Sequence, residues 1–327
     1  MKQNQKLSQN MAAEILAFIE ELNHLKHVDT ILDRILLKAR QLTRADAGSI
    51  FLVEDGGLRF SFVHNDTLYG DDPSAATYAD FTVPISEASI VGFAAKTKQT
   101  LSIDDAYQLG GDLPYSFNPS FDEKMGYRTT SILTIPLLTM NDKLVGVMQI
   151  INAKDDQGAS VPFDEESHTF VPLLANNAAV AVERGIMNRE LVLRMMKMAE
   201  LRDPTETGAH VQRVGAYSAE IYNRWAATHD VEAKELQRTS DTLRLAAMLH
   251  DVGKVGISDM ILKKPGRLTD EEFDTMKWHT VYGARLFQNA TSGLDKMCYD
   301  ISLGHHEKWD APGYPGKVAN LLSEKAE

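Results

Sequence analysis

The feature that most constrains this chain is a histidine and an aspartate, His250 and Asp251, which end the apolar run LRLAAML in the stretch LRLAAMLHDVGKVG. The apolar residues before the pair predict a buried helix end. A buried imidazole and a buried carboxylate need partners, because an unpaired polar group is costly away from water. A metal ion satisfies both groups. The stretch therefore favours a fold that brings further ligands to this helix end, although a lone His-Asp pair is common on protein surfaces.

Histidines concentrate in the C-terminal part of the chain, where the pattern predicts helices almost throughout. Each of these histidines taken alone is more simply a core or surface residue, but the whole set is hard to explain that way. Imidazole and carboxylate ligands without a thiolate suit Fe, Mn or Zn. The candidate ligands are Glu206, His210, His250, Asp251, His279, His305 and His306. Glu206 and His210 lie four residues apart, so on a helix they share one face.

Such a set suits the hydrolysis of a phosphodiester, which is anionic and unreactive. Two metal ions about 3.5–4 Å apart lower the pKa of a water and hold the attacking and leaving oxygens in line. Asp251 has two oxygens with which to bridge the ions, and Lys254 can neutralise charge that grows on the phosphoryl oxygens. We expect Glu307 to orient one of the ligand histidines from behind.

Residues 200–316 resemble an HD-GYP domain, the branch of the HD phosphohydrolases that hydrolyses cyclic di-GMP. The residues that carry the resemblance are His250 to Lys254, Ile257 to Pro265, His279 to Gly283, His305 to Glu307, and Gly313-Tyr314-Pro315. The resemblance implies two or three divalent metal ions, most simply Fe or Mn, and pGpG or GMP as the product.

The resemblance also assigns roles to single residues. It makes His250, Asp251, His279, His305 and His306 metal ligands, with Asp251 bridging, and His210 a further ligand; Glu206 matches members that hold three metals. Lys254 would contact the scissile phosphate, and Tyr314 would face the substrate or a partner domain.

Two departures from the family pattern bear on activity. The tail GKVANLLSEKAE contains no aspartate, whereas the family continues with a helix that carries another ligand aspartate. We therefore expect a C-terminally truncated domain, either an active phosphodiesterase or a catalytically impaired module that binds nucleotide or protein partners. Ala311-Pro312 replaces a flexible glycine and is expected to stiffen the loop that contains Gly313-Tyr314-Pro315, called here the tyrosine loop. An HD hydrolase for another nucleotide is a third reading, which the tyrosine loop disfavours.

The N-terminal half alternates helix and strand signals. Residues 11–43 have a helical apolar period, and a short helix is expected within the stretch IVGFAAKTKQTLSIDDAY before a strand. Two pairs of apolar runs, each pair joined by a turn sequence (Gly56-Gly57, then residues 141–143), predict two β-hairpins. The segment from Leu101 to Arg128, rich in glycine and proline, is expected to be a long loop over a pocket.

This order resembles a GAF domain, a ligand-sensing α/β fold, over roughly residues 11–185. The resemblance includes Asn152, Lys154 and Phe163-Asp164-Glu165, which are similar to the Asn-Lys-Phe-Asp-Glu signature of cyclic-nucleotide-binding members. That signature also occurs in members that bind no nucleotide, so we favour a structural role, in which Lys154 and Asp164 brace the sheet against the last helix. The resemblance implies a small-molecule ligand whose identity the sequence does not give.

Between the two halves the chain is predicted to form one long helix. Its apolar seam has spacings of 7, 4, 4 and 3, close to a coiled-coil period. The seam consists of Val180, Met187, Leu191, Met195 and Met198. A helix that packs on its own domain is one interpretation; we favour a parallel homodimer, in which the helix carries a twist or register change from sensor to output.

Together these patterns predict an α+β chain: a GAF-like sensor domain over 1–165, a connecting coiled-coil-like helix over 166–202, and an incomplete, all-α HD-GYP domain over 203–327. The net charge of −12 argues against binding DNA. Partner signalling domains are expected as possible binding partners of the protein. Cys298 is the only cysteine, so an intrachain disulfide is excluded and a cytoplasmic location is expected. No apolar run reaches 18 residues, which predicts no membrane span.

Overall fold

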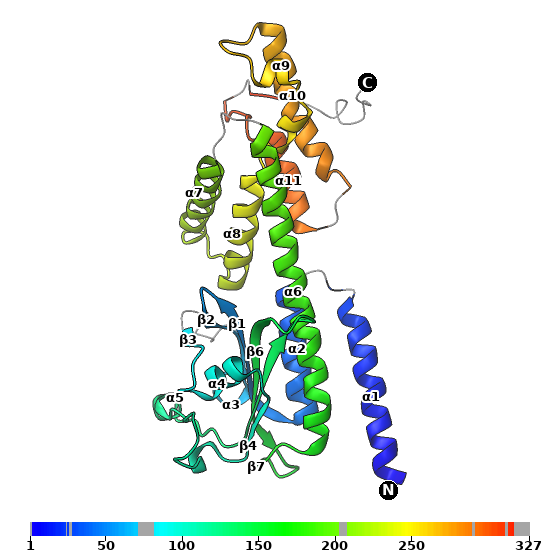
Figure 1. Cartoon of the computed structure of the whole chain (residues 1–327), viewed down its shortest axis with the longest axis vertical. Coiled ribbons are helices and arrows are strands. Elements are labelled where there is room, and N and C mark those ends of the chain that lie inside the picture. Colours follow the sequence, from blue (N-terminus) through cyan, green and yellow to red (C-terminus); the bar gives the residue numbers. More distant parts are fainter. Residues whose placement is uncertain are drawn as a thin grey trace. The chain divides into compact units, whose positions relative to one another are not determined.

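A computed structural model describes residues 2–23, 25, 28–70, 82–202, 208–289, 292–310 and 313–316 of the 327-residue chain. The chain forms two compact units, Met1–Met187 and Asn188–Glu327, and each is described here by itself. The first unit combines a sheet with helices and the second is helical (Figure 1). The predicted α+β class is therefore confirmed.

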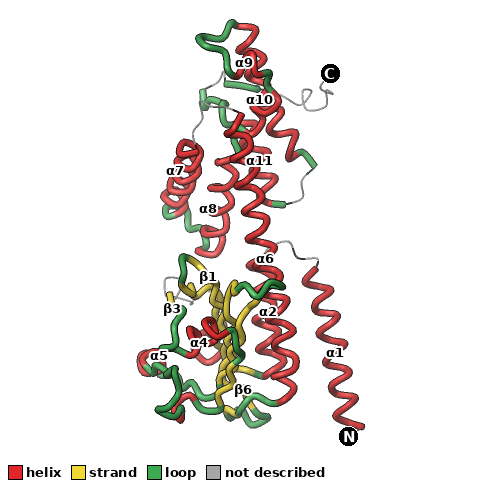
Figure 2. The backbone as a smooth tube through the Cα atoms, viewed as in Figure 1, coloured by secondary structure: helices red, strands yellow, loops and turns green. Residues whose placement is uncertain are grey.

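The first unit is built on one antiparallel sheet (Figure 2). Its strands run in the order β3-β2-β1-β6-β5-β4, and β7 pairs with β6. Both predicted hairpins are present, since β1 pairs with β2 and β5 pairs with β6. The strands are β1 (Ala45–Glu54), β2 (Gly57–Asn65), β3 (Thr82–Pro84), β4 (Leu101–Ile103), β5 (Ile132–Leu138), β6 (Leu144–Lys154) and β7 (Ser160–Val161).

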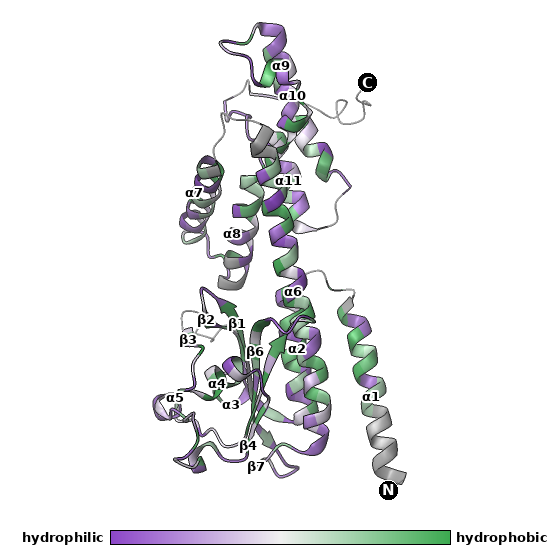
Figure 3. Ribbon diagram, viewed as in Figure 1, coloured by the Kyte–Doolittle hydropathy of each residue, from purple (hydrophilic) through white to green (hydrophobic). Residues whose placement is uncertain are grey.

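Helices cover both faces of this sheet. On one face, α2 (Val28–Thr43) and the first half of α6 (Glu165–Arg202) bury their apolar sides in one core with β1, β5 and β6, and α1 (Lys2–Asn23) adds Ile15 and Leu22 to that core. On the other face, α4 (Ile90–Thr97) packs on the opposite side chains of β1, β2 and β6. The central strands β1 and β6 are accordingly apolar along most of their length, and green predominates in them in Figure 3. Short segments, α3 (Asp66–Tyr69), η2 (Ala106–Gln108) and α5 (Ser120–Met125), complete the unit.

The long helix α6 contributes to the cores of both units. Phe170, Val171 and Leu174 are buried with the sheet of the first unit. Further along the same helix, Met196 is buried in the core of the second unit. The predicted continuous helix is therefore present, and each half of it is held by the unit in which it lies.

The second unit is helical, as predicted, apart from its connecting turns. After α6 it contains α7 (Gly208–Ala226), α8 (Ala233–Met248), the 3₁₀ turn η3 (Val252–Gly256), α9 (Asp259–Leu262), α10 (Asp270–Phe287) and α11 (Gly293–Gly304). A capping box between Thr269 and Glu272 starts α10, and Ser292 caps α11. None of the helices within the described ranges is long and apolar enough to cross a bilayer.

The predicted signature residues of the first unit serve its internal structure. Lys154 forms an ion pair with the buried carboxylate of Asp46 on the neighbouring strand β1. Asp164 instead caps α6, because its Oδ1 accepts hydrogen bonds from the backbone N–H and the hydroxyl of Ser167 at 2.7 and 2.6 Å. Both roles are structural, but the expected bracing of the sheet against α6 is not what the two residues do: Lys154 pairs within the sheet and Asp164 caps the helix.

Asp46 is the centre of a buried polar network. It is only 2% exposed, and its oxygens accept hydrogen bonds from the hydroxyls of Thr67 at 2.7 Å and Tyr127 at 2.8 Å. Asn152 donates to the Tyr127 oxygen at 3.0 Å, so a second signature residue is also engaged. Burial alone would raise the pKa of Asp46. The hydrogen bonds from Lys154, Thr67 and Tyr127 together outweigh this effect, so the pKa lies below its usual value.

The predicted loop from Leu101 to Arg128 contains β4, η2 and α5 joined by irregular backbone. A cavity of about 530 Å³ lies within it. The cavity is lined mainly by residues 106–119, including the rings of Tyr107, Tyr115 and Phe117, and no charged side chain belongs to the described lining. An open pocket therefore lies at this segment, but the segment is not one continuous loop, because β4, η2 and α5 interrupt it.

We predict that Asp46→Asn destabilises the first unit by about 1–3 kcal/mol at neutral pH, because it removes the charge that its hydrogen-bond partners and Lys154 satisfy. A carboxyl with a lowered folded pKa stabilises the fold above its unfolded pKa of about 3.9, and this contribution is lost as pH falls. The difference between wild type and variant should therefore shrink in acid. Hydrogen exchange of the β1 and β6 amides measures it, and a pH-independent difference would contradict the prediction.

Candidate metal centre

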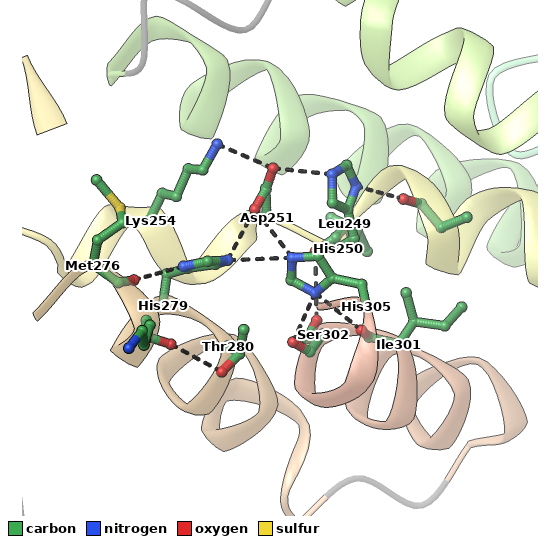
Figure 4. Close-up of polar contacts among 12 residues, drawn as sticks. Leu249, His250, Asp251, Lys254, Met276, His279, Thr280, Ile301, Ser302 and His305 are labelled. Carbon is green, nitrogen blue, oxygen red and sulfur yellow. Dashed lines mark hydrogen bonds and ion pairs between the residues drawn. The ribbon is translucent and has the colours of Figure 1, made fainter. Parts of the chain in front are cut away.

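The His-Asp pair lies where α8 ends, as the apolar run predicts. Leu249 follows the last residue of α8, and Asp251 immediately precedes the 3₁₀ turn η3. The turn directs both side chains toward α10 and the end of α11, where His279 and His305 lie (Figure 4). Three segments separated in sequence therefore contribute side chains to one place in the second unit.

Close backbone packing brings these segments together. A Cβ atom on Gly253 would lie 1.9 Å from the carbonyl oxygen of His279 and 2.3 Å from the amide nitrogen of Gly283. On its other side Gly283 faces Ser302 of α11, whose Cβ would be 3.0 Å from an added Cβ. Glycine is thus required at position 253 for the turn to approach α10, and Gly283 allows α10 to pack closely on α11.

The carboxylate of Asp251 is the centre of the cluster. Its Oδ2 lies 2.9 Å from Nε2 of His250 and 3.0 Å from Nζ of Lys254. Its Oδ1 lies 3.2 Å from Nε2 of His279 and 3.4 Å from Nε2 of His305. The side chains are largely buried, with His279 2% and Asp251 16% exposed. Each of the three imidazoles therefore points the same ring nitrogen at one carboxylate.

Backbone carbonyls set the orientation of these three rings. Each Nδ1 lies within hydrogen-bond distance of a carbonyl oxygen one turn earlier, so Nδ1 carries the proton and donates it. In a neutral ring this leaves a lone pair on Nε2, directed at Asp251. The contacts are His250 to Ala247 at 2.8 Å, His279 to Met276 at 2.7 Å, and His305 to Ser302 at 3.0 Å and Ile301 at 3.2 Å.

This arrangement fits a bound cation. Oδ1 of Asp251 is buried, and it accepts no well-aligned hydrogen bond from the described residues. The Nε2 atoms of His279 and His305 also face each other at 3.2 Å. Lone pairs at this distance repel one another and the carboxylate, so positive charge is needed between them, as a proton or a metal ion. Converging imidazole and carboxylate lone pairs, each oriented from behind, are typical of a metal site.

The pKa shifts in the cluster agree with this requirement. Burial alone would raise the pKa of Asp251. The contacts with the facing imidazoles of His250, His279 and His305 outweigh this effect and lower the pKa, so the carboxyl stays ionised. An ionised carboxylate at this place attracts a cation. Burial, followed by the charges of His305 and His279, lowers the pKa of His306 to about 4, so the His306 ring is neutral at neutral pH and keeps a lone pair for a cation.

The structure brings most of the predicted ligands together. Asp251, His279, His305 and His306 have ligand atoms within 4.8 Å of one another, a group that could hold a metal ion. His250 joins them through Asp251, and the His210 ring lies 6.2 Å from the His250 ring. Glu206 and Ala311-Pro312 lie outside the described residues, so their predicted roles stay predictions.

The tyrosine loop packs against the same cluster. The Tyr314 ring stacks on His306 with centroids 4.5 Å apart, and the Tyr314 amide nitrogen donates to the His306 carbonyl oxygen at 3.3 Å. Glu307 holds this loop, because its Oε1 accepts a hydrogen bond from the Gly316 amide at 2.6 Å. The expectation that Glu307 orients a ligand histidine is therefore wrong: backbone carbonyls perform that task, and their positions have no side-chain signal in the sequence.

Comparison with known families agrees with the division of the chain. Residues 27–182 match the GAF domain family, and residues 207–326 match the HD domain family. The sheet and its helices lie within the first match and the His-Asp cluster lies within the second. The chain therefore carries a GAF domain followed by an HD domain, a metal-dependent class, with a cluster able to bind metal.

Several curated relatives are cyclic-dinucleotide phosphodiesterases by name. A probable cyclic di-GMP phosphodiesterase of Vibrio cholerae is 42% identical over 135 residues, which cover 39% of this chain and 30% of that protein. A cyclic di-GMP phosphodiesterase of Thermotoga maritima is 43% identical over 125 residues, covering 38% and 32%. The 3'3'-cGAMP-specific phosphodiesterase 2 of Vibrio cholerae is 34% identical over 148 residues, covering 45% and 27%. The matched regions thus span about a third of these relatives or less.

We predict that Mn²⁺ raises the unfolding temperature of the second unit, because a ligand that binds only the folded state stabilises it, by about 2.7 kcal/mol at 100 times Kd. All three tryptophans, Trp225, Trp278 and Trp309, lie in this unit, so tryptophan fluorescence follows it. Asp251→Asn, which removes the central charge, should abolish the shift and the bound metal measured by elemental analysis.

The matched control is His229→Ala. His229 is an exposed histidine of the same unit that stacks on Trp225, outside the cluster. Its substitution should leave the Mn²⁺-induced shift unchanged. Equal shifts in wild type and Asp251→Asn would show that the cluster does not bind the ion.

Proposed function

We propose that the HD domain is of the HD-GYP type and hydrolyses cyclic di-GMP to pGpG or GMP. The observation that carries the proposal is the convergence of three Nε2 atoms on Asp251 with the ammonium group of Lys254 beside it. The relatives named as cyclic di-GMP phosphodiesterases and the packed Gly313-Tyr314-Pro315 loop support the choice of substrate.

In this proposal the clustered side chains hold two or three divalent ions, with Fe or Mn preferred. The proposed ligands are His210, His250, Asp251, His279, His305 and His306, joined by Glu206 if a third ion is held. When bound, such ions supply Lewis-acid stabilisation of the phosphoryl oxygens and lower the pKa of water. The imidazoles are suited to this role because their Nδ1 contacts to carbonyls prevent the rings from turning.

Lys254 and Tyr314 act on the substrate rather than on the ions. Lys254 Nζ lies 3.0 Å from Oδ2 of Asp251 and is 19% exposed, so it borders both the cluster and solvent. From there its ammonium group stabilises the negative charge that develops on the phosphoryl oxygens. Tyr314 stacks on His306 at the edge of the metal cluster, and from there it faces the bound nucleotide.

We also propose that the GAF domain regulates this activity through a small-molecule ligand. The cavity within residues 106–119 is the candidate site, and its aromatic lining suits an uncharged ring. Lys154 and Asn152 are engaged with Asp46 and Tyr127, which disfavours their use as cyclic-nucleotide contacts.

The helix α6 is the proposed dimer interface between two copies of the chain. Apolar side chains that are 38–70% exposed recur along one stripe of the helix at near-heptad spacing. Burying the stripe against a second copy removes this surface from water, and a parallel pair keeps the two sensor domains at the same end. The stripe consists of Leu173, Val180, Met187, Leu191, Met195 and Met198.

We predict that the Mn²⁺-loaded chain converts cyclic di-GMP to a linear product and that Lys254→Met lowers kcat by roughly 10²–10³-fold while the bound metal is unchanged. Anion-exchange chromatography of the nucleotides measures the rate. Lys263→Met, which removes an exposed lysine paired with Asp259, should behave as wild type. Tight binding without product would show instead that this chain is a binding module.

We predict that wild type is a dimer by light scattering and that the double variant Met187→Glu/Leu191→Glu is a monomer, because four charges would meet in the apolar interface. Met260→Glu, at an 85% exposed methionine on α9, is the control and should remain dimeric. A wild-type monomer at high protein concentration would rule out the interface.

A further inference from the structure

An exposed aromatic side chain lies beside the cluster without a role in the site described above. Phe273 is in the second turn of α10, six residues before His279, and 45% of it is exposed. An exposed phenylalanine is ordinary by itself. This one is joined to the cluster by ring contacts. The Phe273 and Tyr314 rings form a T-shaped pair with centroids 6.1 Å apart and planes at 84°, and Tyr314 stacks in turn on His306.

The ring of Phe273 is also held in place. Lys277, one turn later on α10, sets its ammonium group 4.9 Å over the ring centre while pairing with Asp274 at 2.7 Å. This contact is a cation–π interaction, which favours one orientation of the ring. Tyr314 is fixed on the other side, because Glu307 bonds the Gly316 amide two residues further on. The exposed part of Phe273 is thus a pre-oriented apolar surface at the rim of the cluster.

We propose that Phe273 stacks on a purine base of the dinucleotide substrate. In a nucleotide the base is separated from the phosphate by one sugar. A phosphate held beside the Lys254 ammonium group at the edge of the cluster therefore leaves the base outside it, where Tyr314 and the exposed ring of Phe273 offer aromatic surface. This inference rests on the proposed function, and it adds a base-binding contact that the metal cluster does not supply.

Stacking on an aromatic ring has a recognisable consequence. Every base has a π face, so stacking tolerates a change from guanine to adenine. The contact is made equally in the ground state and in the transition state, and its loss therefore raises KM and leaves kcat nearly unchanged. A residue that only supported the fold would instead change metal content, or kcat and KM together.

The test uses the full chain loaded with Mn²⁺ and four variants. Phe273→Ala removes the ring, Phe273→Leu keeps apolar volume without a π face, and Phe273→Trp enlarges the π face. Leu286→Ala is the control, because it truncates another exposed apolar side chain, 57% exposed, near the far end of the same helix. KM and kcat are measured with cyclic di-GMP and 3'3'-cGAMP, and Kd for pGpG is measured by calorimetry.

We expect Phe273→Ala and Phe273→Leu to raise KM for both dinucleotides and Kd for pGpG by roughly 5- to 150-fold, the range for losing one base–aromatic stack. Phe273→Trp and Leu286→Ala should bind like wild type or, for the tryptophan, more tightly. Metal content should be the same in all proteins. If Phe273→Leu matches wild type, or if Phe273→Ala changes kcat or metal content instead of KM and Kd, the stacking role is wrong.

The same measurements separate this inference from the proposed function. A wild type that binds pGpG through Phe273 but hydrolyses neither dinucleotide would contradict the phosphodiesterase and keep the stacking contact. A wild type that hydrolyses cyclic di-GMP with unchanged KM in Phe273→Ala would keep the phosphodiesterase and overturn the stacking contact. A wild type that neither binds nor hydrolyses would overturn both.

Discussion

The helical unit depends on one buried negative charge, the carboxylate of Asp251. Three imidazoles direct lone pairs at it from different segments, and Lys254 is the only ammonium group that contacts it among the described residues. Such a gathering is unfavourable unless positive charge is added. The glycine at 253 and the carbonyls behind the rings nevertheless hold the side chains in place. The second unit is therefore folded around a candidate cation site.

Periodicity was sufficient to predict the larger elements of the fold. The hairpins, the long helix and the helical second unit all follow from apolar spacing in the sequence, and the end of α8 at the His-Asp pair follows from the run before it. Short elements such as β3 and α3 were not predicted, since three or four residues carry too little pattern. They form because neighbouring strands and caps stabilise them, as Asn65 does for α3.

For the metal centre, residue identity was predictable but the arrangement of the ligands was not. Residue type and order indicated which side chains come together. The groups that orient the imidazoles are backbone carbonyls, which any residue has, so no letter in the sequence marks them. The same limit explains Glu307, whose partner is the amide of Gly316. The sequence did not indicate a role for Phe273, because its place beside the cluster depends on a contact with Tyr314 that exists only in the folded loop.

Helix α6 has a consequence for how the chain can be divided. One uninterrupted helix supplies buried side chains to the sheet in its first half and to the helical core in its second. A fragment that lacked its half of α6 would leave apolar side chains of its own core exposed to water. Neither core can therefore be isolated without a part of this helix.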